Sequence, residues 1–276
     1  MSISNSANRA THRSDRQHQR TLILAMAAYL TVSASAAFAQ GDGYSVQRNA
    51  SAPTSGIATI RIANGSGRLV ITGRGGSSTL KATAMVHGSS QEAVNSIKLV
   101  TERDGDVLTL RADRPDRNWS YGDNAYVDLT VEVPSNIALN VDDGSGGARI
   151  ENVGALHLRS GSGGVHVTSV GGSVDLESGS GGAELRDVRG NVTAETGSGG
   201  MTIDGVKGSV DVIRAGSGEL SIKGVTGSLH LGSIGSGTLV ADNIGGDLTV
   251  DSKGSGSVEY TNVKGRVSVP DRGRDR

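Results

Sequence analysis

The chain has 276 residues, 42 of them glycine, a formal net charge of −1, seven aromatic residues and no cysteine. The charge balance argues against a nucleic-acid-binding or anionic-membrane-binding surface, and the lack of cysteine excludes disulfides, thiolate catalysis and cysteine-ligated zinc. So few aromatic rings allow only a thin, aliphatic core, and so much glycine indicates disorder unless the glycines are periodic.

The N-terminus has the pattern of an export signal. A polar, basic stretch precedes the apolar run Leu22–Leu30, and Ala37-Phe38-Ala39 places small residues where signal peptidase cuts. We therefore expect residues 1–39 to be removed between Ala39 and Gln40. The apolar run is short of the roughly 20 residues that span a bilayer, which disfavours an uncleaved anchor. The mature chain is expected to be exported, periplasmic or at the cell surface, with no transmembrane segment.

Residues 40–141 are expected to form a β-rich N-terminal cap that includes a first coil. In chain order, the expected elements are that coil at 56–73, a strand at Leu80–Val86, a capped helix from Ser89 to about Ile97, a hairpin around Asp104-Gly105, a polar loop at 113–124 and a strand at Ala125–Val133. The coil is predicted because a Gly-Ser-Gly triplet lies there between two alternating apolar segments.

The same triplet recurs in the second half of the chain. It begins at positions 144, 161, 179, 197, 216, 235 and 254, at intervals of 17 to 19 residues. The segments on both sides alternate apolar and polar residues, which is the period of a half-buried strand. Two residues past each second strand we expect a left-handed corner, because most residues there are of types that tolerate it. These positions are Asn152, Ser169, Asp187, Gly205, Gly224, Asn243 and Asn262.

A coil that repeats once per triplet explains why equivalent positions carry the same class of residue. The pattern predicts an all-β fold, a single-stranded parallel β-solenoid of about seven coils over 142–269, followed by a charged tail at 270–276. The usual crossover preference predicts right-handed winding. An antiparallel meander, which would also alternate, is the competing architecture. The last three coils carry one extra residue before the triplet, so a bulge is expected at Ile213–Ala215.

Three motifs carry a family resemblance. Gly65–Gly73, Leu129–Pro134 and Leu139–Gly146 with its serial repeats resemble the bacterial Toastrack family of β-strand-repeat proteins, also labelled "putative adhesin". The resemblance implies an elongated repeat domain that is exported or displayed at the cell envelope, as many members are, some of them in stress-sensing systems. It implies a non-enzymatic protein, because the family has no established catalytic residues to carry over.

One outward column of the predicted solenoid holds most of the candidate chemistry. It reads His157, Asp175, Thr193, Asp211, His230 and Thr249. Stacking about 4.8 Å apart would bring His157 beside Asp175 and Asp211 beside His230. Three interpretations remain open: a solvated ladder of surface charges, a ligand-facing strip, for instance for a glycan, or a catalytic His–Asp pair.

Other patterns do not favour catalysis, a metal or a cofactor. Glu177 and Glu195 share a column, and Arg149, Glu184 and Arg186 lie outward on second strands, but mixed charges are what any exposed strand carries. The triplets lack the lysine and helix of a phosphate-binding loop and the aspartate of calcium-binding nonapeptide repeats. We therefore expect no catalytic, cofactor-binding or metal-binding residues.

The sequence favours an exported, non-enzymatic envelope protein, an adhesin-like binding or structural module whose partner is an envelope or surface glycan or protein. The alternative is a carbohydrate-active β-helix enzyme, a lyase or hydrolase, since parallel β-helices are also used by such enzymes. A third possibility is an assembly subunit. The motifs of the chain are structural, so the three functions differ in what they predict for a glycan array and for the genomic neighbours.

Overall fold

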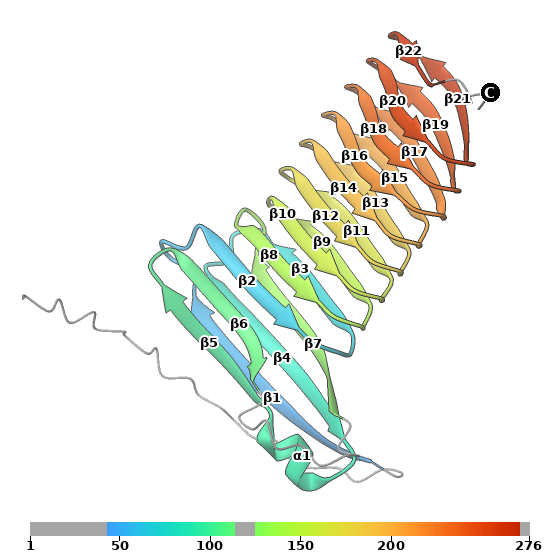
Figure 1. The fold of residues 1–276 in the computed structure, drawn as a ribbon. Coiled ribbons are helices and arrows are strands. Elements are labelled where there is room, and N and C mark those ends of the chain that lie inside the picture. The colour runs from blue at the N-terminus through green and yellow to red at the C-terminus, as the bar shows by residue number, and fades with distance from the viewer. Residues whose placement is uncertain (1–42, 114–124, 271–276) are drawn as a thin grey trace, which may run out of the picture.

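The computed structural model describes residues 43–113 and 125–270. The expected signal peptide, nearly all of the loop at 113–124 that holds the only tryptophan, and most of the charged tail lie outside these residues. The described part contains one short helix and 22 strands, which form two eleven-stranded sheets. The sheets face each other along an elongated stack of coils (Figure 1).

The two sheets, named A and B, are built from alternating segments of the chain. Sheet A runs, in spatial order, through β1 (Tyr44–Pro53), β4 (Thr79–Gly88), β7 (Ala125–Pro134), β3 (Leu69–Arg74), β9 (Ala148–Val153), β11 (Val165–Val170), β13 (Ala183–Val188), β15 (Met201–Val206), β17 (Glu219–Val225), β19 (Thr238–Ile244) and β21 (Ser257–Val263). Sheet B runs through β5 (Lys98–Asp104), β6 (Val107–Asp113), β2 (Thr59–Asn64), β8 (Ala138–Asp143), β10 (Leu156–Ser160), β12 (Val174–Ser178), β14 (Val192–Thr196), β16 (Val210–Ala215), β18 (Leu229–Ile234), β20 (Leu248–Lys253) and β22 (Val267–Ser268).

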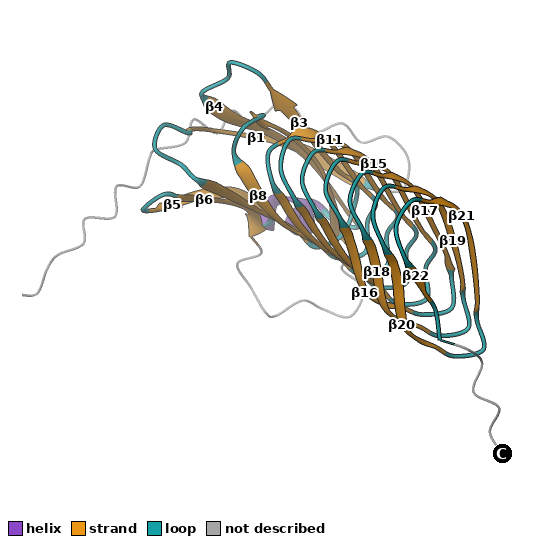
Figure 2. Cartoon of the chain, turned by 90° about the horizontal axis from the view of Figure 1, so that it is seen from above, coloured by secondary structure: helices purple, strands orange, loops and turns teal. Residues whose placement is uncertain are grey.

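From β8 onward each coil contributes one strand to each sheet, and equivalent strands pair in parallel. Val165 of β11, for example, pairs with Ala148 of β9 on one side and Ala183 of β13 on the other. Figure 2 shows these coils stacked one behind another, with loops at both edges of the two layers. The parallel β-solenoid is confirmed and the antiparallel meander is wrong. Right-handed winding stays a prediction.

The core is a thin layer of aliphatic side chains between the sheets. On β11, Val165 and Val167 are 1% and 0% exposed, whereas His166 between them points outward. Because equivalent residues stack, each inward side chain packs against its copies in the neighbouring coils. Burying one valine or leucine contributes about 1.5–3 kcal/mol, so a core without aromatic rings is sufficient when it repeats in every coil.

The corner that leads from sheet A to sheet B is left-handed in every coil. All seven predicted positions have positive φ: Asn152 (59°), Ser169 (60°), Asp187 (57°), Gly205 (74°), Gly224 (65°), Asn243 (55°) and Asn262 (53°). The β-branched residue that follows each corner points back inside, as Val170 and Val188 do at 1% and 0% exposure. The corner prediction is therefore confirmed.

The opposite corner, formed by the triplets, needs glycine for a different reason. A Cβ atom on Gly146 would overlap the carbonyl oxygen of Gly67 in the coil below, and the same overlap recurs in later triplets. The main chains are this close because they are hydrogen bonded. Ser145 N donates to Gly65 O and Ser162 N to Gly144 O, each at 3.2 Å. Close backbone approach explains the repeated glycines.

The predicted bulge lies at Ile213. Val212 pairs with Ala194 and Arg214 with Glu195, so Ile213 is the extra residue, and its side chain is 53% exposed. Gly232 and Asp251 occupy the same extra position in the next two coils of sheet B. The cross-section of the solenoid therefore changes here, as the sequence predicts.

The N-terminal part is continuous with the solenoid. Strands β2 and β3 form the first coil, with β2 between β6 and β8, and β3 between β7 and β9. Residues 75–137 separate this coil from the next one in the sequence, but in the structure its triplet stacks directly under the triplet of that next coil. Antiparallel strands β1 and β4 extend sheet A, and the β5–β6 hairpin extends sheet B.

Two local predictions in this region are displaced by one residue. Helix α1 (Gln91–Ser96) is capped by Ser90 and not Ser89: Ala93 N donates to Ser90 Oγ at 3.1 Å, and Ser90 has the extended backbone of a cap. In the hairpin, Asp104 still pairs with Val107, so the turn residues are Gly105 and Asp106.

Candidate functional site

The candidate strip forms a single column on the outer face of sheet B. In register, His157 on β10 neighbours Asp175 on β12, followed by Thr193 on β14, Asp211 on β16 and His230 on β18. His157 Nδ1 lies 2.8 Å from Asp175 Oδ2. The structure thus brings together the first pair that the sequence singles out, and the five side chains share one face.

The second pair is joined by a third residue that the sequence analysis did not include. His230 Nδ1 contacts Asp211 Oδ1 at 2.8 Å, and its Nε2 contacts Asp251 Oδ2 at 2.9 Å. Hydrogen bonds to Asp211 and then Asp251 raise the pKa of His230 above its ordinary value. Asp251 reaches the imidazole because it occupies the extra bulge position of its coil.

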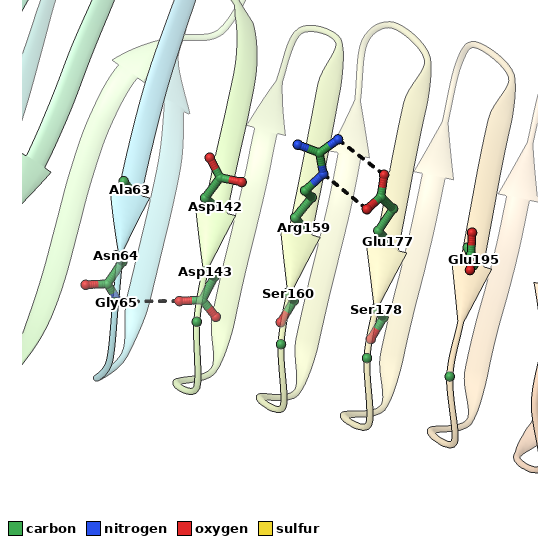
Figure 3. A pocket seen from close by; sticks show the side chains of 14 residues that line it. Ala63, Asn64, Gly65, Asp142, Asp143, Arg159, Ser160, Glu177, Ser178 and Glu195 are labelled. Atoms are coloured by element: carbon green, nitrogen blue, oxygen red, sulfur yellow. Dashed lines mark hydrogen bonds and ion pairs between the residues drawn. The ribbon is translucent and has the colours of Figure 1, made fainter.

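A second outward column runs parallel to the strip, two residues further along each strand, or three on β16, where the bulge intervenes. It contains Asp142, Arg159, Glu177, Glu195 and Arg214. Arg159 is bidentate to Glu177, with Nε to Oε2 at 3.1 Å and Nη2 to Oε1 at 3.4 Å (Figure 3). This hydrogen-bonded carboxylate raises the pKa of Arg159. Arg214 pairs with Glu195, so both central carboxylates of the column are neutralised by an arginine.

Two shallow grooves border these columns, one at each end of the strands of sheet B. A groove of about 520 Å³ contains His157, Asp175 and Thr193. A groove of about 650 Å³ contains Asp142, Arg159, Glu177 and Glu195 beside the glycines of the triplet corner (Figure 3). The outer face of β8, β10, β12 and β14 connects the two.

Beneath the larger groove lies a buried polar track that the sequence analysis missed. Asn64, Asp143 and Ser160 stack at the inward position before successive triplets and are 2%, 4% and 6% exposed. Asn64 Oδ1, Asp143 Oδ2 and Ser160 Oγ have no hydrogen-bond partner among the described residues. Burial raises the pKa of Asp143, against a smaller lowering by the Asn64 amide 3.4 Å away. The strand alternation could have revealed this track, because it places polar residues at an inward position.

A second missed feature is a side-chain ladder before the strands of sheet B. At each step a side-chain oxygen accepts a hydrogen bond from the main chain of the next coil at 2.7–3.2 Å. The residues are Ser173, Asn191, Ser209, Ser228, Asp247 and Arg266, the last as donor only. The signal was a repeated Ser, Asn or Asp before each strand.

The outer face of sheet A carries its own ion pairs. His166 Nδ1 lies 3.0 Å from Glu184 Oε2, Arg186 also pairs with Glu184, and Arg149 pairs with Glu151 at 2.7 Å. The hydrogen bond from His166, with the nearby Arg186, lowers the pKa of Glu184. Arg149, Glu184 and Arg186, which were weighed for catalysis from the sequence, therefore belong to exposed pairs on the face opposite the grooves that border the strip.

Within residues 43–113 and 125–270, no three His, Asp or Glu side chains come together in a way that could hold a metal ion. The one helix of these residues is far too short to cross a membrane.

No protein-family model and no curated protein matches the chain. Similar solved structures include a "putative adhesin" from Bacteroides fragilis, 16% identical, with a TM-score of 0.44, covering 80% of this chain and 96% of that one. Another "putative adhesin", from Parabacteroides distasonis, is 15% identical with a TM-score of 0.42, covering 78% and 97%. A "putative cell adhesion protein" from Clostridium sporogenes is 12% identical with a TM-score of 0.36, covering 78% and 97%. At these identities and TM-scores the similarity carries no argument about function, which has to be argued from the surface of this chain.

Proposed function

We propose that this chain is an exported, non-enzymatic module of the cell envelope that binds a surface ligand in an adhesin-like manner. The binding face is the outer side of sheet B over β8, β10, β12 and β14. The observation that supports it is the pair of grooves on this face, which border the strip containing His157 and Asp175 and the column containing Arg159 and Glu177.

The charges of this face favour a neutral, hydroxyl-rich ligand such as a glycan. Some of its carboxylates are paired, as in His157–Asp175 and Arg159–Glu177, and the charges left over on these four strands are acidic. An acidic excess of this kind disfavours an anionic ligand. The side chains of Arg159 and Glu177 are 55% and 50% exposed, so each keeps hydrogen-bonding groups open to solvent although the two are paired. A hydroxyl group both donates and accepts, so it can use such mixed pairs.

The glycine corner adds a second property that a binding face needs. At Gly144, Gly161 and Gly179 no side chain stands between the backbone and solvent, and these residues line the larger groove. An extended ligand can therefore lie against the main chain while Arg159 and Glu177 contact it from one side. The binding groups repeat from coil to coil, which suits a polymer with a repeating unit.

The arrangement of carboxylates favours binding over glycoside cleavage. Acid–base catalysis needs two carboxyl groups, one of them protonated, across the scissile bond. Glu177 and Glu195 are neighbours in one column and each is held by an arginine, so they do not face each other across a bound sugar. The triplet corners that join the strands are short and leave no long loop over the groove.

A glycan array probed with the mature chain tests the proposal. We expect retained glycans with no release of reducing ends, and at least a tenfold loss of affinity in His157→Ala and Arg159→Met. His166→Ala is the matched control, because it removes an equivalent histidine–carboxylate pair from sheet A. Binding that is unchanged in the sheet B variants, or reducing-end release abolished by His157→Ala, would refute the proposal.

Export is tested separately by cell fractionation and N-terminal sequencing. The proposal requires the chain outside the cytoplasm with Gln40 as its first residue. A cytoplasmic chain that retains residues 1–39 would contradict it, whatever the array shows.

A further inference from the structure

A small cavity lies at the N-terminal end of the stack, away from the grooves of sheet B. It has a volume of about 300 Å³ and is lined by Arg48, Asn49, Asn95, Lys98, Leu99 and Val100. These residues come from β1, α1 and β5, which lie together at this end of the molecule (Figure 1). The cavity sits where the edge strands of the two sheets approach each other.

Arg48 occupies an inward position on β1. Its neighbours in the alternation, Val46 and Ala50, are buried at 6% and 5% exposure. The Arg48 guanidinium is half-buried, and Nε donates to Ile97 O at 3.4 Å. Among the described residues no carboxylate forms an ion pair with it. A guanidinium has five N–H donors, so most of its hydrogen-bonding capacity remains available.

Lys98 provides a second cation at the same cavity. The carboxylate opposite it in the hairpin, Asp113, instead contacts Arg111, with Nη1 to Oδ1 at 3.6 Å. Within the part of the chain that the structure describes, Lys98 has no ion pair, and the cavity lining contains no acidic residue.

The two asparagines of the lining also offer donors. Asn49 Oδ1 accepts from Gln47 Nε2 at 3.2 Å and from Thr83 Oγ1 at 3.1 Å. Asn95 Oδ1 accepts from Gln91 Nε2 at 3.2 Å. Because these oxygens are engaged, amide N–H groups are what the two side chains still have to offer, so the polar side chains of the lining are mainly donors.

We propose that this cavity binds the carboxylate of a small aliphatic acid. Arg48 and Lys98 would hold the carboxylate, because a guanidinium and an ammonium together neutralise it and supply charge-assisted hydrogen bonds. Leu99, 5% exposed, and Val100 provide the apolar wall against which a short alkyl chain packs. The volume is at the lower end of the range of ligand pockets, which limits the ligand to a small molecule.

The competing explanation is that Arg48 only protects an edge strand. An inward-pointing charge on an edge strand discourages pairing with another chain, and β1 is the last strand of sheet A. That role requires one charge at the edge. It does not require a cavity, a second cation from β5 or two amide donors around it.

Calorimetric titration of the full chain with sodium octanoate tests the proposal, with 1-octanol and octylamine as the neutral and cationic analogues. Of the three compounds, we expect only octanoate to bind saturably. Its affinity should fall at least tenfold in Arg48→Met and in Lys98→Met. Lys81→Met is the matched control, because this exposed lysine of β4 does not line the cavity. Amide chemical shifts of Asn95 and Leu99 should change on titration.

The possible outcomes separate the two explanations. No saturable binding of octanoate, equal binding of 1-octanol, or affinity unchanged in both Arg48→Met and Lys98→Met would overturn the proposal and leave edge protection. Two variants are used because Arg48 is half-buried and its replacement could disturb folding, whereas Lys98 is exposed. The glycan experiment concerns β8, β10, β12 and β14, none of which lines this cavity, so either proposal can fail alone.

Discussion

His230 Nδ1 lies 2.8 Å from Oδ1 of Asp211, its equivalent one coil earlier in the outward column of sheet B. The other ring nitrogen contacts Asp251, an extra residue of the following coil. One imidazole thus bridges three consecutive coils of the solenoid just past the point where its cross-section changes.

This bridge makes stability depend on pH. The pKa of His230 is raised in the folded chain, so its contribution is complete below the pKa of the unfolded chain, about 6.5, and is lost as pH rises through the folded value. Because the pair is exposed and screened, we expect His230→Gln to cost only about 0.5 kcal/mol at pH 5.5 and nothing at pH 9. Urea unfolding at both pH values measures this. If His230→Gln lowered the stability at pH 5.5 by the same amount in a variant that already carries Asp211→Asn and Asp251→Asn, the prediction would be wrong.

Asp143 should behave in the opposite sense. Burial raises the pKa of its carboxyl, so folding favours the neutral form, and stability declines as pH rises from the unfolded value, about 3.9, through the folded one. Asp143→Asn removes this penalty. We expect the variant to be more stable by on the order of 1–2 kcal/mol at pH 7, with the gain disappearing near pH 3.5. A gain that is independent of pH would show that ionisation is not its cause.

Neighbouring glycines of one triplet corner should differ sharply. A Cβ on Gly163 would overlap the carbonyl oxygen of Gly146, whereas one on Gly164 would have its nearest contact at 4.0 Å. We expect Gly163→Ala to cost at least about 3 kcal/mol and Gly164→Ala to stay within about 0.5 kcal/mol of the parent. Chemical denaturation of both variants provides the comparison. Similar stabilities would mean that the coils are not stacked this closely.

The left-handed corner offers a substitution that should stabilise the chain. Ser169 has φ of 60°, whereas Gly205 and Gly224 occupy the same position in later coils. A left-handed conformation costs a non-glycine residue about 1–2 kcal/mol, partly offset in glycine by the greater entropy of the unfolded chain. We expect Ser169→Gly to stabilise by about 0.5 kcal/mol and Ser169→Val to destabilise by more than 1 kcal/mol. The midpoint temperatures of thermal unfolding of the two variants should shift in opposite directions relative to the parent. A shift of both midpoints in the same direction would argue against strain at this corner.

Much of the solenoid was predictable because one physical constraint is repeated in every coil. The left-handed position at Asn152 recurs six more times, and the extra residue at Ile213 is visible as a change in the interval between triplets. Errors arose where a feature occurs once. Glu92, three residues after Ser89, predicts Ser89 as the helix cap, but the cap is the adjacent Ser90, whose side chain accepts from Ala93 N.

The candidate site was only partly accessible from sequence. Column membership follows from the repeat, so His157 and Asp175 could be placed together. Asp251 could not, because it belongs to a different outward position and reaches His230 only from the extra position that it occupies on β20. The cavity near Arg48 and Lys98 joins residues from β1 and β5, far apart in the chain and outside any repeat.

The position of the first coil between β6 and β8 on one sheet and β7 and β9 on the other has a mechanical consequence. A pulling force applied at the C-terminal end can detach β22 and β21 first and then peel the coils away singly, each layer holding only its neighbour. At the opposite end, residues 56–74 are sandwiched by segments that follow them in the chain, so peeling from there must break several layers at once. The molecule should therefore yield gradually from one end and resist at the other.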